Sequence, residues 1–475
     1  MAKEKIKVGA EGITDARVLG VPRMLVLGFQ HMFAMFGATV LVPLLTGLDI
    51  ATTLLMAGLG TLLFHLLTKG KVPAFLGSSF AFLGGYGAVA PLAGNGTMTN
   101  EQLLPYACLG VACAGLVYLI MAGLIKLIGI NKVMKFFPPV VTGPIIISIG
   151  LGLSGTAISN CSANWLLALT ALVVVVVFNV WGKGMSKIIP ILLGVLISFG
   201  LAVILALTAG QTVVVGDAEY IAVGGNEKLL IFSQAALDEL KAAPWIGLPV
   251  VWKHTVFGGV DWSNASLIIS SIIAIVPIAL ATMMEHIGDI SAISSTVGKN
   301  FIKDPGLHRT LMGDGLATTM ASLFGAPANT TYGENTGVLA LSKVYDPRVI
   351  RIAAIIAIVF SFSPKFAALV SLLPTAVVGG ISFVLYGMIS AIGVRNVVES
   401  RVDFSKSRNL IVAAIILVTA LGLGTVSFAI GKITISLSAL AVASIAGIVL
   451  NAILPGKDFV FEEENPKDMG ASLKV

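Results

Sequence analysis

Nine residues, TMMEHIGDI at positions 282–290, place two carboxylates and an imidazole in one short stretch. Glu285 and Asp289 are one helical turn apart and share a helix face, whereas His286 points about 100° away from Glu285. Two carboxylates this close in a medium of low dielectric constant cannot both ionise at low cost. The spacing therefore predicts a proton-binding site, with Glu285 and Asp289 as its proton-coupling residues.

The surroundings of this stretch indicate that it lies inside a membrane. It ends the apolar run LIISSIIAIVPIALATMM, and Glu285 precedes Lys299 by 14 residues, which is about 21 Å of helix and near the middle of a ~30 Å hydrocarbon core. An ionisable residue at that depth is a functional candidate by default. The alternatives are a hydrogen-bonded polar pair between helices and a loop outside the membrane, which the apolar ISAIS that follows disfavours.

Other polar residues interrupt apolar segments in the same way. Glu334 and Asn335 lie in TTYGENTGV, Asp314 lies in LMGDGLA, and His31 lies in FQHMFAMFG. We predict that Glu334 is a third buried carboxylate of the site and that Asn335 orders the nearby backbone. Asp314 is expected to tie helices together, and His31 has both a helix-bridging and a ligand-binding interpretation.

The composition specifies the class of protein. Hydrophobic residues make up 56% of the 475 residues and charged residues 11%, whereas soluble domains carry about 25% charged residues. This excludes a soluble multidomain protein and predicts a polytopic membrane protein. The three cysteines, Cys108, Cys113 and Cys161, have no metal-ligand spacing, so we expect small buried side chains, with no metal and no cofactor.

Apolar stretches of spanning length predict about fourteen segments in two sets of seven. With both termini in the cytoplasm, cytoplasmic connections hold 25 of the 30 Lys and Arg residues, as the positive-inside rule requires. The net charge of +6 then follows from topology and needs no nucleic-acid partner. The expected segments are 24–46, 50–68, 73–92, 104–128, 137–155, 164–181, 188–209, 266–297, 309–325, 331–343, 348–372, 374–393, 409–424 and 434–454.

Seven segments per half mean that the halves enter the membrane in opposite senses, which predicts an inverted repeat. The third segment, VPAFLGSSFAFLGGYG, and the tenth, GAPANTTYGENTGVLAL, are both interrupted by proline and small polar residues. Irregular backbone at membrane depth is tolerated where it lines a cavity or pairs with other backbone. We expect two short antiparallel strands there, the alternative being Gly/Ser packing faces of ordinary helices.

Four motifs together resemble one family. GFQHMFAMFGATVLVPLLTG, PAFLGSSFAF, MMEHIGD and GAPANTTYGENTGVLALSK are similar to the signatures of the nucleobase-ascorbate transporters (nucleobase:cation symporter family 2), and most closely to the bacterial uracil permeases. The resemblance implies proton-coupled symport of a nucleobase by alternating access in the cytoplasmic membrane, with a possible homodimer through a gate domain. It implies a core domain (17–130 and 264–372), a gate domain (131–210 and 373–455), an external loop (211–263) and a cytoplasmic tail (456–475).

The resemblance also implies site residues. Glu285 and Glu334 would bind the nucleobase, helped by strand-end backbone at Phe80 and Gly333, with His31 in support. Phe80 or Tyr332 is suited to pack on a ring face. Ser78, which lies in the same PAFLGSSFAF motif as Phe80, is a further supporting candidate.

Two departures bear on the substrate. Asp289 replaces a histidine of the best-known uracil permeases and is similar to many purine carriers, and Ser342 replaces a signature threonine. Glu334, in contrast, resembles uracil permeases, so uracil is the favoured substrate and xanthine or urate the alternative.

An anion transporter or channel of similar fold is disfavoured by the carboxylates of the site. An intramembrane enzyme is disfavoured because HExxH and GxSxG motifs are absent from the sequence.

Overall fold

The fold is a bundle of apolar helices in two consecutive sets of seven segments. The computed structural model describes residues 12–430 and 433–456, so the predicted cytoplasmic tail lies almost wholly outside the described residues. Within that part of the chain, seven helices are long and apolar enough to span a membrane, and the bent pair α16 (Pro347–Ser361) and α17 (Pro364–Ser371) makes an eighth span. Three shorter apolar helices, the 17-residue helix Leu307–Leu323 and two broken segments complete the fourteen.

Each predicted segment corresponds to a helix, or to a strand joined to a short helix. The first set comprises α1 (Val21–Thr46), α2 (Ile50–Leu67), β1 (Leu76–Ser78) with α3 (Leu83–Val89), α4 (Asn100–Ile128), α6 (Pro139–Cys161), α7 (Trp165–Trp181) and α9 (Pro190–Ala209). The second comprises α12 (Ala265–Ile275) continued by α13 (Ala279–Val297), α14 (Leu307–Leu323), β5 (Asn329–Thr331) with α15 (Gly333–Ser342), α16 (Pro347–Ser361) with α17 (Pro364–Ser371), α18 (Thr375–Glu399), α19 (Ser407–Gly422) and α20 (Ala439–Ile453). The predicted fourteen-segment inverted repeat is therefore confirmed.

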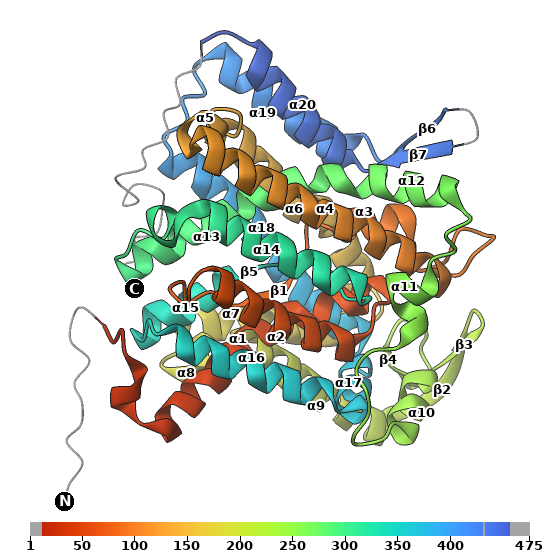
Figure 1. The fold of residues 1–475 in the computed structure, drawn as a ribbon. Coiled ribbons are helices and arrows are strands. Elements are labelled where there is room, and N and C mark those ends of the chain that lie inside the picture. Colours follow the sequence, from red (N-terminus) through yellow and green to blue (C-terminus); the bar gives the residue numbers. More distant parts are fainter. Residues whose placement is uncertain (1–11, 431–432, 457–475) are drawn as a thin grey trace, which may run out of the picture.

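The broken third and tenth segments meet in the middle of the molecule (Figure 1). β1 and β5 pair antiparallel, with Leu76 opposite Thr331 and Ser78 opposite Asn329. Their outer backbone groups are satisfied by neighbouring helices: the Thr61 hydroxyl of α2 donates to the Leu76 carbonyl at 3.2 Å, and Thr318 of α14 donates to the Asn329 carbonyl at 2.7 Å. These bonds explain how non-helical backbone persists at membrane depth.

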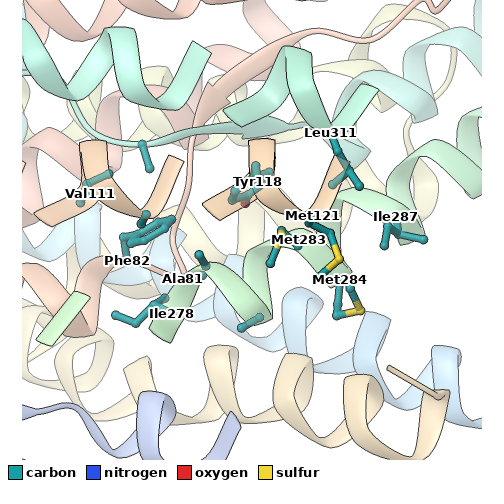
Figure 2. Packing of buried hydrophobic residues seen from close by; sticks show 14 of the residues in the cluster. Ala81, Phe82, Val111, Tyr118, Met121, Ile278, Met283, Met284, Ile287 and Leu311 are labelled. Carbon is teal, nitrogen blue, oxygen red and sulfur yellow. The ribbon is translucent and has the colours of Figure 1, made fainter. Parts of the chain in front are cut away.

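Helix α13, which carries the TMMEHIGDI stretch, packs in a large apolar cluster with α4 and α14. Figure 2 shows Met283 and Met284 of α13 beside Tyr118 and Met121 of α4. The Tyr118 hydroxyl also donates to Thr282 Oγ1 at 2.5 Å. Glu285 therefore lies one helical turn after Thr282, whose hydrogen bond to Tyr118 holds α13 against α4.

A second group of helices contains α6, α7, α18 and α19, in which α6 crosses α18 closely. Glycines make this approach possible: a Cβ on Gly393 of α18 would lie 2.5 Å from the backbone nitrogen of Ile147 and 2.8 Å from the carbonyl oxygen of Gly143. Small residues at helix crossings are typical of membrane proteins. The backbones of α6 and α18 therefore lie in direct contact.

The long connection after α9 forms a small domain at one end of the bundle (Figure 1). β2 (Gly210–Val215), β3 (Ala218–Val223) and β4 (Leu230–Ser233) form an antiparallel sheet. Helix α10 (Gln234–Ala242) follows β4 directly. Ser233 is the N-cap residue, but its side chain makes no capping hydrogen bond.

Several predicted boundaries were wrong. A hairpin of β6 (Val426–Ile430) and β7 (Ile433–Leu437) separates α19 from α20, so the last helix begins at Ala439 and not at residue 434. α18 continues six residues past the predicted end at 393, to Glu399. The predicted segment 348–372 bends by 89° between α16 and α17. The hairpin was missed because its β-branched residues also satisfy a hydropathy criterion for a spanning helix.

The segment before α1 is attached to the linker between α15 and α16. Ile13 forms a parallel bridge with Val344, and the Ala16 amide donates to Asp346 Oδ2 at 2.7 Å. Arg348 Nη1 lies 2.9 Å from Asp15 Oδ1. The start of α1 and the end of α20 lie at the same end of the bundle (Figure 1), opposite the β2–β4 sheet.

Candidate functional site

Glu285 and Asp289 line one side of a cavity of about 330 Å³ between the helix groups. Gly288 and Ala292, at the i+3 and i+7 positions from Glu285, continue the same face of α13 along the cavity. This is the shared face that the i, i+4 spacing predicts. The lining residues outside α13 come from β1 and the residues after it, α5 (Ile130–Met134) and the residues after it, α6, the segment from β5 to α15, and α18 with its C-cap.

The ends of the two strands form the inner end of the cavity. Ser78, Phe80, Tyr332 and Gly333 all line it, and Gly333 lies close enough to α13 that a Cβ there would be 3.6 Å from Asp289 Oδ1. The Phe80 ring contacts Tyr386 of α18 edge to face, with centroids 5.8 Å apart. Backbone, aromatic and acidic groups therefore surround one space.

The Tyr332 hydroxyl joins three segments beside the cavity. It donates to the Ser78 carbonyl at 2.9 Å and accepts from Thr39 Oγ1 of α1 at 3.1 Å. The Ser78 hydroxyl donates to the Thr39 carbonyl at 3.0 Å. These bonds hold the end of β1, and with it the approach to Phe80, against α1 and the tenth segment.

A series of polar side chains runs inward from Asp289. Thr331 Oγ1 donates to Asp289 Oδ2 at 3.0 Å and lies 3.4 Å from His286 Nδ1. The same ring nitrogen, His286 Nδ1, lies 3.2 Å from Asp314 Oδ2, and both side chains are fully buried. A buried carboxylate is costly without a partner, so the imidazole is the natural counter-group for Asp314. His286 therefore links the cavity wall to α14.

His31 and Asn335 lie together away from the carboxylates of α13. Asn335 Nδ2 lies 3.2 Å from His31 Nδ1 and donates to the His31 carbonyl at 3.1 Å. Both side chains are buried, and neither is among the cavity-lining residues. This contact fixes α15 against α1, which is a supporting position.

The structure thus brings together Glu285, Asp289, Ser78, Phe80, Tyr332 and Gly333 at the cavity and places His31, Asn335 and Asp314 behind it. Glu334 is in the first turn of α15, but its side chain lies outside the described part of the structure. The roles assigned to these residues stay predictions.

Sequence reasoning missed three groups of lining residues. Thr330, Thr331 and Thr336 flank the predicted motif residues, and an uncharged hydroxyl gave no signal of its own. The contribution of α6 and of Met388, Ile389 and Ile392 depends on helix packing. Arg395 and Glu399 also line the cavity, although the sequence indicates Arg395 only as one of the Lys and Arg residues that mark cytoplasmic connections.

Metal binding has no support from the described side chains. No group of three or more His, Cys, Asp or Glu residues among them is arranged to hold a metal ion. Cys108 and Cys161 are buried, and Cys113 is half-buried. The chemistry available at the cavity is hydrogen bonding, proton exchange and ring packing.

Comparisons with known proteins agree with this architecture. A cyanobacterial bicarbonate transporter, BicA, has a transmembrane domain that matches with a TM-score of 0.59 and 15% identity, covering 92% of this chain and 98% of that one. SLC26A9 matches with a TM-score of 0.59 and 12% identity, over 90% of this chain and 64% of that one. These likenesses concern the fold alone.

Sequence comparisons give much higher identity. A uracil permease of Bacillus caldolyticus is 40% identical over 462 residues, covering 94% of this chain and 96% of that protein. Uracil permeases of Bacillus subtilis and Escherichia coli are 38% and 35% identical, covering 96% and 90% of this chain and 97% and 90% of those proteins. These relatives are transporters and not enzymes, as the sequence predicted. Because residues 22–429 also match the model of the Permease family, the chain belongs to that family of multi-pass membrane transporters.

Proposed function

We propose that the protein takes up a nucleobase, uracil, across the cytoplasmic membrane together with a proton. The names of the relatives support the substrate class, since three that share 35–40% identity over at least 90% of this chain are uracil permeases. The observation that carries the proposal is the single cavity that brings Glu285 and Asp289 together with the ends of both broken segments.

The lining of the cavity suits a flat, polar ring. Uracil presents N–H donors and carbonyl acceptors on its edge, so a carboxylate of Glu285 can accept from the ring while backbone N–H groups near Phe80 and Gly333 donate to it. Phe80 lies edge to face against Tyr386, which leaves an aromatic face or edge for contact with the base. Glu334 is the second proposed nucleobase-binding carboxylate.

Proton coupling follows from the two neighbouring carboxylates of α13, Glu285 and Asp289. A proton on Glu285 or Asp289 relieves the repulsion between the two carboxylates, so proton binding and the geometry of the site depend on each other. Thr331, the last residue of β5, donates a hydrogen bond to Asp289. Protonation of Asp289 therefore changes a hydrogen bond to the strand end beside the proposed nucleobase site. No other cofactor is required.

Transport proceeds by alternating access between two groups of segments. Segments one to four and eight to eleven form the core domain, and the remaining six form the gate domain against which the core moves. The cavity lies between α13 of the proposed core and α6 and α18 of the proposed gate, and it extends to the last turns of α18, which supports exchange of the site with that side. We assign that side, which holds most Lys and Arg residues, to the cytoplasm.

Uptake of radiolabelled uracil into proteoliposomes with an inward proton gradient tests the proposal. Gradient-driven uptake by the unaltered protein, lost in Glu285→Gln and Glu334→Gln, is expected. Arg401→Gln, which changes an exposed residue after α18, is the matched control and should retain uptake. Absence of uracil uptake in the unaltered protein would refute the proposed function.

A purine is the second candidate because Asp289 is similar to the residue of many purine carriers. The same proteoliposomes with radiolabelled xanthine or urate separate the two. Gradient-driven uptake of xanthine or urate without uptake of uracil would assign the site to purines.

A further inference from the structure

The cavity has two polar ends, and the residues of α18 that line it between these ends are apolar. At the inner end are Glu285, Asp289 and the strand ends, and along the passage lie methionine, isoleucine and phenylalanine side chains. At the other end Arg395, Asn396, Glu399 and Ser400 line the same cavity. These four residues belong to the last turns of α18 and its C-cap.

The two ends are too far apart to hold one base together. Tyr386, which contacts Phe80 at the inner end, precedes Arg395 by nine residues on α18, or about 14 Å of helix. A ring leaving the inner site along α18 therefore passes the apolar side chains of Met388, Ile389 and Ile392 before it meets Arg395. Desolvated polar edges of a nucleobase are unfavourable on such a surface.

The outer polar group offers the hydrogen-bonding set that such a ring needs. Arg395 Nε donates to Glu399 Oε1 at 2.6 Å, and the two side chains are 38% and 32% exposed. The pair leaves both Nη groups of Arg395 available as donors, since the described residues offer them no further hydrogen bond. Asn396 Oδ1 is buried and has no hydrogen-bond partner within the described part of the chain.

We propose that Arg395, Asn396 and Glu399 form a second, transient nucleobase-binding subsite at the mouth of the cavity. This inference rests on the proposed function and adds a step to it. The Arg395 guanidinium and the Asn396 amide group donate to ring carbonyls, and Asn396 Oδ1 and the Glu399 carboxylate accept from ring N–H groups. The subsite lowers the barrier for a base that crosses the apolar passage, without contributing to equilibrium binding at the inner site.

The expected signature is kinetic. A subsite that a base visits on the way changes the rate of passage, and the rates of entry and exit change by the same factor because the overall equilibrium is unaltered. Asn396→Leu should lower Vmax/KM for uracil about fivefold, as expected for one hydrogen bond to an uncharged partner, and Arg395→Gln about tenfold or more. The dissociation constant for uracil should stay within about twofold of that of the unaltered protein.

The experiment measures uracil binding to the purified full-length protein together with uptake and efflux in proteoliposomes. The variants are Asn396→Leu and Arg395→Gln, with Arg401→Gln as the control that removes a neighbouring cation outside the cavity lining. Unchanged binding also shows that each variant is folded. Slower uptake and efflux, by equal factors and with unchanged binding, support the subsite.

Two results would overturn it. One is transport by both variants as fast as by Arg401→Gln. The other is a loss of transport in each variant that is matched by an equal loss of binding, which would place the effect at the inner site or in the fold. An unaltered protein that neither binds nor carries uracil refutes the proposed function itself, and the subsite with it. The binding and transport of the unaltered protein therefore distinguish the two failures.

Discussion

Removal of the Tyr332 hydroxyl tests how the strand ends are held at the cavity. Tyr332→Phe keeps the ring, which is 4% exposed, and removes the donor that lies 2.9 Å from the Ser78 carbonyl. Thr39 loses an acceptor at 3.1 Å, but its hydroxyl also lies 3.1 Å from Met35 Sδ and keeps that contact. The main loss is therefore one buried hydrogen bond to the end of β1.

The size of the effect follows from that loss. A hydrogen bond between uncharged groups contributes about 1 kcal/mol net, which corresponds to about a fivefold change in a dissociation constant. Ser78 precedes Phe80 by two residues, so a less firmly held end of β1 lowers the affinity of the site for uracil more than it lowers the stability of the whole protein. We expect Tyr332→Phe to raise the dissociation constant for uracil about fivefold.

Equilibrium binding of radiolabelled uracil to the purified protein is the assay. Thr39→Val is the matched control, since it removes the weaker contact to Tyr332 and keeps the bond from Tyr332 to Ser78; its effect should be less than about twofold. Equal affinity of Tyr332→Phe and the unaltered protein would refute the reasoning. So would a larger effect of Thr39→Val than of Tyr332→Phe.

Three further predictions concern stability, measured by thermal unfolding of the purified protein. Gly393→Ala should lower the unfolding temperature by several degrees, the equivalent of about 1–3 kcal/mol, because its Cβ meets the backbone of α6; an unchanged temperature would contradict this crossing. Asp346→Ala should cost about 1–3 kcal/mol, because the α16 cap and the bond from the Ala16 amide are lost; retention of full stability would argue against that attachment. The Arg17 guanidinium holds the pKa of Asp15 below its ordinary value of 3.8, so its stabilising effect is present above that value and is lost as the pH falls through the lower folded pKa. Asp15→Asn should thus be slightly less stable at pH 7, with a difference that disappears in acid; a difference independent of pH would contradict it.

Much of the architecture could be predicted from residue patterns because a bilayer restricts the possible structures. Proline and glycine in PAFLGSSF and GAPANTTYG indicated the strands, since non-helical backbone at that depth must pair. The i, i+4 spacing placed Glu285 and Asp289 on one cavity wall. The His286–Asp314 contact could not be predicted, because it depends on how α13 packs beside α14. The position of Arg395 on the cavity could not be predicted either, because it depends on the crossing of α6 and α18.

The most direct test of the central claim measures proton and uracil movement together. Proteoliposomes containing the protein and a trapped pH-sensitive dye, with no initial pH gradient, receive external uracil. We predict acidification of the interior that begins with uracil addition, and that is lost in Glu285→Gln. Uracil entry measured in parallel without any acidification would contradict proton coupling at the carboxylates of α13.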